Sequence, residues 1–263
     1  MDKITTIVGK EWSEVFKNKI VFFSVLFLPL ILAIIPLGML FAFSNIEGME
    51  AEMSDPEIME LAGQMCTGLS TMDCSLVYTL NLFVLMFMIL PVAIPVTIAA
   101  YSIVGEKTTR SLEPLLATPI TTVELLTAKI IAAVVPAIGA TWAAFGLFLF
   151  GAWLLAPPAV FAEFFRPHWL LAILVVAPLL TILATCIAVI VSSRVTDPRV
   201  AEQLSALVIL PLILLVIGQS VGLILIDERI MLLMGAVVLV SDIALLYLAI
   251  RLFQRETILT RWK

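Results

Sequence analysis

The chain has 263 residues, of which 62% are hydrophobic and 13% are charged, and its formal net charge is -5 at pH 7. Its mean hydropathy of +1.16 excludes a water-soluble globular protein, in which about 25% of residues would be charged. Seven acidic residues and no basic residue lie within 44–75, so the negative charge belongs mainly to one loop and gives no reason to expect a nucleic-acid partner.

The chain begins with an amphipathic pattern over residues 1–19. Apolar residues recur there at helical spacing, with lysines and glutamates between them. These apolar residues are Ile4, Ile7, Val8, Trp12, Val15 and Phe16. The pattern predicts a helix in the cytoplasmic membrane interface with Trp12 at headgroup depth. The alternative is a simple cytoplasmic helix that leads into the first span.

Six long apolar segments predict six transmembrane helices in one membrane domain covering 1–263. Each is long enough to cross about 30 Å of hydrocarbon, which takes about 20 residues. Lipid cannot satisfy open backbone groups, and the alternating pattern of barrel strands is absent, so an all-α membrane fold is expected. The predicted spans are 20–43, 76–104, 127–154, 169–192, 204–226 and 230–250. The first segment is about twice the length of a signal-peptide core and no cleavage pattern follows it, so we expect the N-terminus to be retained.

The positions of lysine and arginine predict the orientation of these spans, because basic loops stay on the cytoplasmic side. If both termini are cytoplasmic, thirteen of the fifteen basic residues lie inside and only Arg166 and Arg229 lie outside. The opposite orientation would reverse this count. The sequence therefore predicts an N-in/C-in topology.

The first outer loop contains Cys66 and Cys74, in the compartment where disulfides persist, and a bridge between them is one expectation. Cys186 lies within the fourth span and is expected to be a small apolar packing residue. His168 is the only histidine, and beside Trp169 at a span boundary it indicates an interfacial anchor rather than a metal ligand.

A charged segment separates the second and third spans. Its GEKTT sequence is not a phosphate-binding loop, since Glu106 stands between the glycine and Lys107 and the upstream glycine is missing. The pattern instead predicts a cytoplasmic helix with an apolar side, interrupted at Pro114. A break and a capping box at Thr121 and Glu124 then begin the third-span helix. A short amphipathic helix at the membrane base is suited to docking on another protein.

The sequence EKTTRSLEPLLATPITTVELLTAK resembles the segment between spans two and three of ABC-2 type ABC transporter permeases. The N-terminal helix, the six spans and the ending LFQRETIL agree with that family. The resemblance implies a coupling helix, 105–120, that contacts separate cytoplasmic ATPases. The matching residues are Glu106, Lys107, Arg110, Ser111, Leu112, Glu113, Leu115, Leu116, Thr118 and Pro119.

The resemblance also implies partners and a location. The membrane domain would pair with a second permease copy or paralogue in the lipid of a prokaryotic plasma membrane. ATP and Mg would be bound by the partner ATPases, so this chain itself is expected to bind no cofactor and to be no enzyme. ATPase closure would move the coupling helix and the two spans joined to it. Pro91, Pro95 and Pro136 would then be flexing points or, alternatively, static kinks.

Four polar residues in the spans are candidates for a cargo pathway or for helix packing. Asn81 and the pair Gln219 and Ser220 would form either a polar exit or interhelical hydrogen bonds. Asp242 is unusual, because an ionised carboxylate at mid-span costs about 2.5–3.5 kcal/mol on insertion scales. It would bind a proton or small cation, or act as a neutral hydrogen-bonding partner between helices.

The function expected from these features is export of a hydrophobic, amphiphilic or ionic cargo, with the direction taken from the resemblance. The apolar spans favour such cargo over a sugar or peptide, which would need more polar partners. The alternative is the membrane subunit of an ABC-linked mechanical or cofactor-maturation complex that does not itself transport. An intramembrane enzyme is excluded, since the spans lack the paired catalytic groups that such chemistry requires.

Overall fold

The computed structural model describes residues 2–45, 71–108, 120–224 and 226–252, and the regular structure within them is entirely helical. The elements are α1 (Asp2–Val15), α2 (Lys19–Asn45), α5 (Thr71–Phe87), α6 (Leu90–Thr108), α8 (Thr122–Leu155), α9 (Pro158–Glu163), α10 (Pro167–Leu171), the π-helical η1 (Ala172–Val176), α11 (Ala177–Arg194), α12 (Pro198–Ser205), the 3-10 segment η2 (Ala206–Ile209), α13 (Leu210–Ser220) and α14 (Glu228–Leu252).

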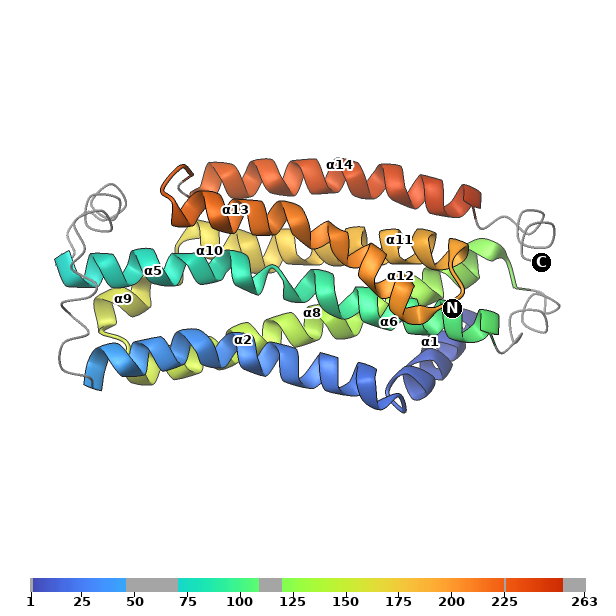
Figure 1. The fold of residues 1–263 in the computed structure, drawn as a ribbon, viewed down its shortest axis with the longest axis horizontal. Coiled ribbons are helices and arrows are strands. Elements are labelled where there is room, and N and C mark those ends of the chain that lie inside the picture. The colour runs from blue at the N-terminus through green and yellow to red at the C-terminus, as the bar shows by residue number, and fades with distance from the viewer. Residues whose placement is uncertain (1, 46–70, 109–119, 225, 253–263) are drawn as a thin grey trace.

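Six helical stretches among the described residues are long and apolar enough to cross a membrane, as predicted. They are Val21–Phe43 in α2, Asp73–Lys107 in α5 and α6, Val123–Leu155 in α8, Pro167–Arg194 from α10 to α11, Pro198–Ser220 from α12 to α13, and Glu228–Leu252 in α14. Figure 1 shows them running along the long axis of one bundle, with α1 at one end and α9 at the other. We call the first of these the α1 end.

The second and fourth spans form the centre of the bundle. In the most apolar part of the second span 78% of residues are buried, and in that of the fourth 56%, against 17% in the fifth. α6 packs along α11, and the other helices surround this pair. The charged segment after α6 therefore connects directly to the most buried helix of the protein.

Pro91 interrupts the second span. α5 ends at Phe87 and α6 begins at Leu90, with a turn at 88–89 between them. Because proline has no N–H, the carbonyl of Phe87 loses its regular helical donor and the helix breaks at this point. The interruption agrees with the kink predicted at Pro91, and flexing there remains a prediction.

The fifth span ends at Ser220, earlier than its predicted end at residue 226, because a glycine cap terminates α13. Gly222 has a positive φ of 74°. Its N–H donates to the carbonyl of Gln219, and the N–H of Leu223 donates to that of Gly218. This pattern satisfies the last carbonyls of the helix and turns the chain toward α14.

α1 docks against α8 at the α1 end. Ile7 and Val8 pack on Ala128 and Ala132, whose small side chains let the two helices approach closely. The predicted N-terminal helix is thus present, and its position in the membrane interface remains a prediction.

Trp12 forms a hydrogen bond with α8, a contact that the sequence did not predict. Its indole Nε1 donates a hydrogen bond of 3.0 Å to the carbonyl of Ala132. That carbonyl lies four residues before Pro136, which has no N–H to offer it. α1 therefore supplies the donor that the proline removes from the third span.

A second tryptophan, Trp142, likewise donates to a carbonyl of the fourth span that a proline leaves without a helical donor. Within η1 the N–H of Ala177 reaches back five residues to Ala172, and the next residue, Pro178, has no N–H. The carbonyl of Ile173 is left without a helical donor, and the Nε1 of Trp142 on α8 donates to it at 3.1 Å. These contacts fix α8 against α1 and against the fourth span.

Candidate functional site

The predicted coupling segment joins α6 to α8 at the α1 end. α6 continues through Thr108, so residues 105–108 form its last turn rather than the start of a separate helix. Eight of the ten predicted coupling residues lie outside the described residues: Arg110, Ser111, Leu112, Glu113, Leu115, Leu116, Thr118 and Pro119. The structure describes the two stems that hold this segment, the last turn of α6 and residues 122–129 at the start of α8.

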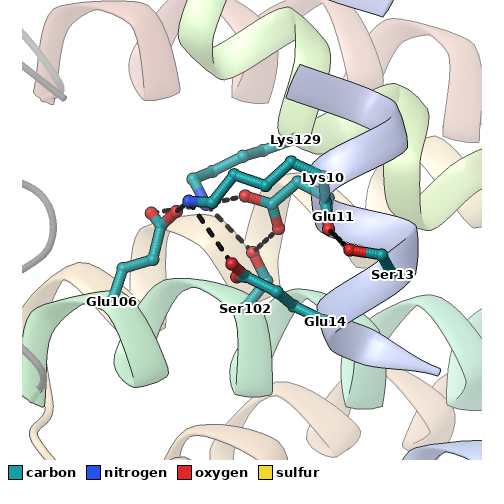
Figure 2. Close-up of polar contacts among 7 residues, drawn as sticks. All are labelled: Lys10, Glu11, Ser13, Glu14, Ser102, Glu106 and Lys129. Carbon is teal, nitrogen blue, oxygen red and sulfur yellow. Dashed lines mark hydrogen bonds and ion pairs between the residues drawn. The ribbon is translucent and has the colours of Figure 1, made fainter. Parts of the chain in front are cut away.

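A buried ionic cluster joins both stems to α1 (Figure 2). The Nζ atom of Lys129 on α8 lies 2.8 Å from Oε1 of Glu11 and 2.7 Å from Oε2 of Glu106. It also donates to Oγ of Ser102 at 3.0 Å, and Ser102 in turn donates to Glu11. Lys10 Nζ donates to the other oxygen of Glu106 at 3.1 Å. We call Lys10, Glu11, Ser102, Glu106 and Lys129 the ionic cluster.

The cluster has a buried centre and an exposed edge. The side chains of Lys129 and Glu11 are each 3% exposed and that of Glu106 is 5% exposed, whereas that of Lys10 is 39% exposed. A cavity of about 420 Å³ opens beside Lys10 and Glu106. Removing one partner of such a buried pair leaves an uncompensated charge, so the three helices are strongly held in this arrangement.

The charges of the cluster shift the pKa values of its α1 members. Burial, the largest influence on the Glu11 carboxyl, would raise its pKa, but the charge and hydrogen bond of Lys129 together with the Ser102 hydrogen bond hold this pKa below its ordinary value of 4.5. Burial, the largest influence on Lys10, would lower its pKa, but the Glu106 carboxylate together with the charges of Glu14 and Glu11 raises this pKa above its ordinary value of 10.5. Both α1 residues are therefore charged at neutral pH.

The depressed pKa of Glu11 predicts acid sensitivity. Its contribution to stability is present above pH 4.5 and is lost as the pH falls through the lower pKa of the folded state. The stability advantage of the wild type over Glu11→Gln should thus be present at neutral pH and disappear on acidification. Denaturant unfolding of both proteins in detergent measures it, and an advantage that persists at the acidic end would contradict this prediction.

The last turn of α6 is also tied to the opposite side of the bundle. Lys107 Nζ donates to the carbonyls of Ser193 at 3.3 Å and Val195 at 3.1 Å, at the C-terminal end of α11. A cation is favourable there because the last carbonyls of a helix lack internal donors. Nearer the N-terminal end of α6, Thr97 Oγ1 donates to Glu202 Oε1 of α12 at 2.5 Å.

The other stem begins with the predicted capping box. The N–H of Glu124 donates to Oγ1 of Thr121 at 3.2 Å, and the N–H of Thr121 donates to Oε2 of Glu124 at 2.8 Å. This reciprocal pair confirms the predicted start of the third-span helix. Both ends of the segment 109–119 are therefore anchored by specific side-chain contacts.

The sequence identified part of this site and missed its centre. Glu106 and Lys107 were predicted as coupling residues, and their described contacts lie inside the chain. Glu11 and Lys129 were not identified as their partners. One signal was available: Glu11 falls at helical spacing between Ile7 and Val15, on the apolar side of α1, where an acid needs a buried partner.

Comparison with known families agrees with this architecture. The family model described as ABC-2 family transporter protein matches residues 5–230, which include most of α1, both stems and the first five candidate spans. The chain belongs to the ABC-2 transporter family. No curated protein matched it in a separate search. The protein is thus a multi-pass membrane permease subunit, of a family whose members work with ABC ATPases.

In this permease Asn81 forms interhelical hydrogen bonds. Its Oδ1 accepts from Trp169 Nε1 at 2.9 Å and lies 3.1 Å from His168 Nε2. His168 is 8% exposed and buried between helices, which corrects its prediction as an interfacial anchor. A buried imidazole needs a hydrogen-bond partner, and Asn81 provides one for His168.

Gln219 and Ser220 differ in their surroundings. The Gln219 amide is fully buried, and among the described residues neither its Nε2 nor its Oε1 has a hydrogen-bond partner. Its backbone carbonyl accepts a bond of 2.9 Å from the Tyr78 hydroxyl of α5. Ser220 is exposed and donates to the carbonyl of Val216 in its own helix.

The structure describes the bonding state of two of the three cysteines. Cys74 is disulfide-bonded, and Cys186 is a free, buried thiol, as expected for an apolar packing residue. Cys66 lies outside the described residues, so its pairing with Cys74 remains a prediction.

Proposed function

We propose that this permease subunit exports a hydrophobic, amphiphilic or ionic cargo across the plasma membrane of a prokaryotic cell. Separate ATPase subunits, which bind ATP and Mg, would supply the energy through residues 109–119. Family membership supports the role as a permease. The observation that carries the coupling role is that both stems of this segment are fixed by side-chain contacts at one end of the bundle.

The ionic cluster supports transmission of force through three helices at once. Lys129 links α8 to Glu106 of α6 and to Glu11 of α1 over 2.7–2.8 Å. Separating these charges in a buried site is unfavourable, so a displacement of either stem carries the others with it. Glu106 and Lys107 would then act as positioning residues, and the eight predicted residues within 110–119 would contact the ATPase.

In this proposal the interruption between α5 and α6 is where the second span bends to absorb the displacement. α6 carries one stem, and α5 continues toward the opposite end beyond the break at Pro91. Kinks at proline lack one helical hydrogen bond, which lets the two halves change their angle more easily than a continuous helix. In the proposed cycle α6 tilts with the ATPase while α5 keeps its contacts with α13.

The outer faces of α13 and α14 expose apolar side chains, which suits contact with lipid or with a second permease copy. Leu214, Leu233 and Val240 are 67%, 67% and 68% exposed. Exposed apolar side chains of this kind on a membrane span are covered by lipid or by another apolar surface. We assign these faces to membrane lipid and to the contact between two permease copies.

The coupling proposal is tested by changing the surface of the segment. Glu113→Lys together with Leu116→Asp is expected to abolish recruitment of the ATPase, because it reverses one charge and removes one apolar contact. Copurification of the tagged permease with its ATPase on a sizing column measures this. An unchanged complex would contradict the proposal.

A matched control makes the same chemical changes elsewhere. Glu228→Lys together with Leu223→Asp alters an exposed acid and a leucine that is 80% exposed, near the end opposite α1. The complex should survive in this control. Reconstitution of the intact complex in liposomes with cargo candidates then distinguishes an exporter from a mechanical complex that does not transport.

A further inference from the structure

Asp242 lies in the buried stripe of α14. The stripe recurs at helical spacing and consists of Met231, Gly235, Val238, Asp242 and Ala249. It faces α11 and η1: a side chain built on Gly235 would lie 3.6 Å from Val176. Asp242 therefore occupies a position where the pattern calls for an apolar residue.

The carboxyl of Asp242 has no hydrogen-bond partner among the described residues. The residue is 3% exposed, and both carboxyl oxygens are buried and unpaired. Hydroxyls on α11 and α14 donate within their own helices: Thr181 and Thr185 donate to carbonyls of α11, and Ser241 donates to Val237 of α14. No serine or threonine in the described ranges therefore forms the interhelical bond to Asp242 that a packing role requires.

No cationic side chain among the described residues compensates this carboxyl. The titratable or charged groups on α14 and on the helices packed against it are Glu228, Arg229, Tyr247 and Arg251 on α14, Cys186 and Arg194 on α11, His168 on α10, and Glu124 and Lys129 on α8. Of these, Cys186 is close enough for its thiol to interact electrostatically with Asp242.

The basic residues of this set lie far from Asp242 or are already paired with other carboxylates. At about 1.5 Å per residue, Arg251 and Arg229 lie about 14 and 20 Å from Asp242 along α14. Arg194 lies about 12 Å beyond Cys186 along α11 by the same measure. Lys129 is held by Glu11 and Glu106 in the ionic cluster. An ionised carboxylate would therefore be buried at mid-span without compensation, which is strongly unfavourable.

We infer that Asp242 is a proton-binding site, which holds its proton while α14 is packed on α11 and releases it when that contact opens to water. The proton removes the uncompensated charge, and opening of the seam restores hydration of the carboxylate. Proton release is then linked to movement of the sixth span. This inference does not depend on the proposed ATPase contact, because the site lies entirely within the chain.

Infrared spectroscopy of the purified full chain in lipid tests the inference directly. The difference spectrum between the wild type and Asp242→Asn at neutral pH should contain the carbonyl stretch of a protonated carboxylic acid, lost in the variant. The matched control is Asp227→Asn, an exposed aspartate at the start of α14, which should lose carboxylate bands instead. Carboxylate bands at Asp242 would overturn the inference.

Two further measurements cover the other outcomes. If carboxylate bands assigned to Asp242 shift when sodium replaces a bulky organic cation, the site binds a metal cation and the proton assignment is wrong. If Asp242→Asn does not fold, wild-type chain with carbon-13 aspartate is measured instead. An isotope-shifted protonated-acid band then supports the inference, and its absence overturns it.

Discussion

Replacing Lys129 by methionine is expected to lower the free energy of unfolding by about 3–5 kcal/mol, because it leaves the carboxylates of Glu11 and Glu106 buried without their shared cation. Lys10 remains beside Glu106, but its side chain is 39% exposed and does not replace the ammonium at the centre of the cluster. The loss is measured by denaturant unfolding in detergent. Docking of α1 should weaken together with it.

Two variants make this prediction specific. Lys17→Met makes the same change at an exposed lysine of the same region and should alter stability by no more than about 0.5 kcal/mol. Adding Glu11→Gln and Glu106→Gln to Lys129→Met removes the uncompensated charges and should restore much of the loss. If the single variant unfolds like the wild type, or the triple variant is no more stable than the single one, the cluster does not hold these helices.

Replacing Trp169 by alanine should destabilise the opposite half of the bundle by about 3–5 kcal/mol, the range for emptying a large buried aromatic site. Its side chain is 1% exposed and stacks on Phe148 and Phe145, with ring centroids 5.9 and 5.7 Å away. Its indole also donates to Asn81. The change removes packing from three helices and a donor from a buried amide, and unfolding in detergent measures the total.

Two tryptophan variants separate these effects. Trp153→Ala removes an indole that is 63% exposed and should change stability by about 0.5 kcal/mol. Trp169→Phe keeps an aromatic ring but removes the donor to Asn81, and should lose about 1 kcal/mol. Equal losses for Trp169→Ala and Trp153→Ala would show that the aromatic cluster is not a core of the fold.

The span number and the helix starts were predictable because they depend on local sequence. The length of an apolar segment decides whether it can cross a membrane, and the capping box depends on two residues three positions apart, Thr121 and Glu124. The kink at Pro91 follows in the same way from one missing N–H. The end of α13 was missed because Gly222 lies inside an apolar run, where composition hides its positive φ.

The polar contacts within the bundle were not predictable, because they join residues far apart in sequence. His168 was expected at the interface from its neighbour Trp169, yet it lies buried near Asn81, which belongs to another helix. The hydrogen bond from Trp12 to the Ala132 carbonyl of the third span was not predicted, and the headgroup depth of Trp12 remains a prediction. A buried partner can be inferred from sequence only when a charged residue interrupts an apolar side, as Glu11 does.

The sequence by itself determined a six-span helical membrane protein with a charged segment between its second and third spans, because hydropathy, charge and capping act over short distances along the chain. The tertiary structure alone decided that Lys129 joins Glu11 and Glu106, and that Asp242 has no hydrogen-bond partner within the described part of the chain. The physical reason is that the stability of a buried charge depends on which groups the fold brings within about 3–4 Å of it, and helix packing sets those distances.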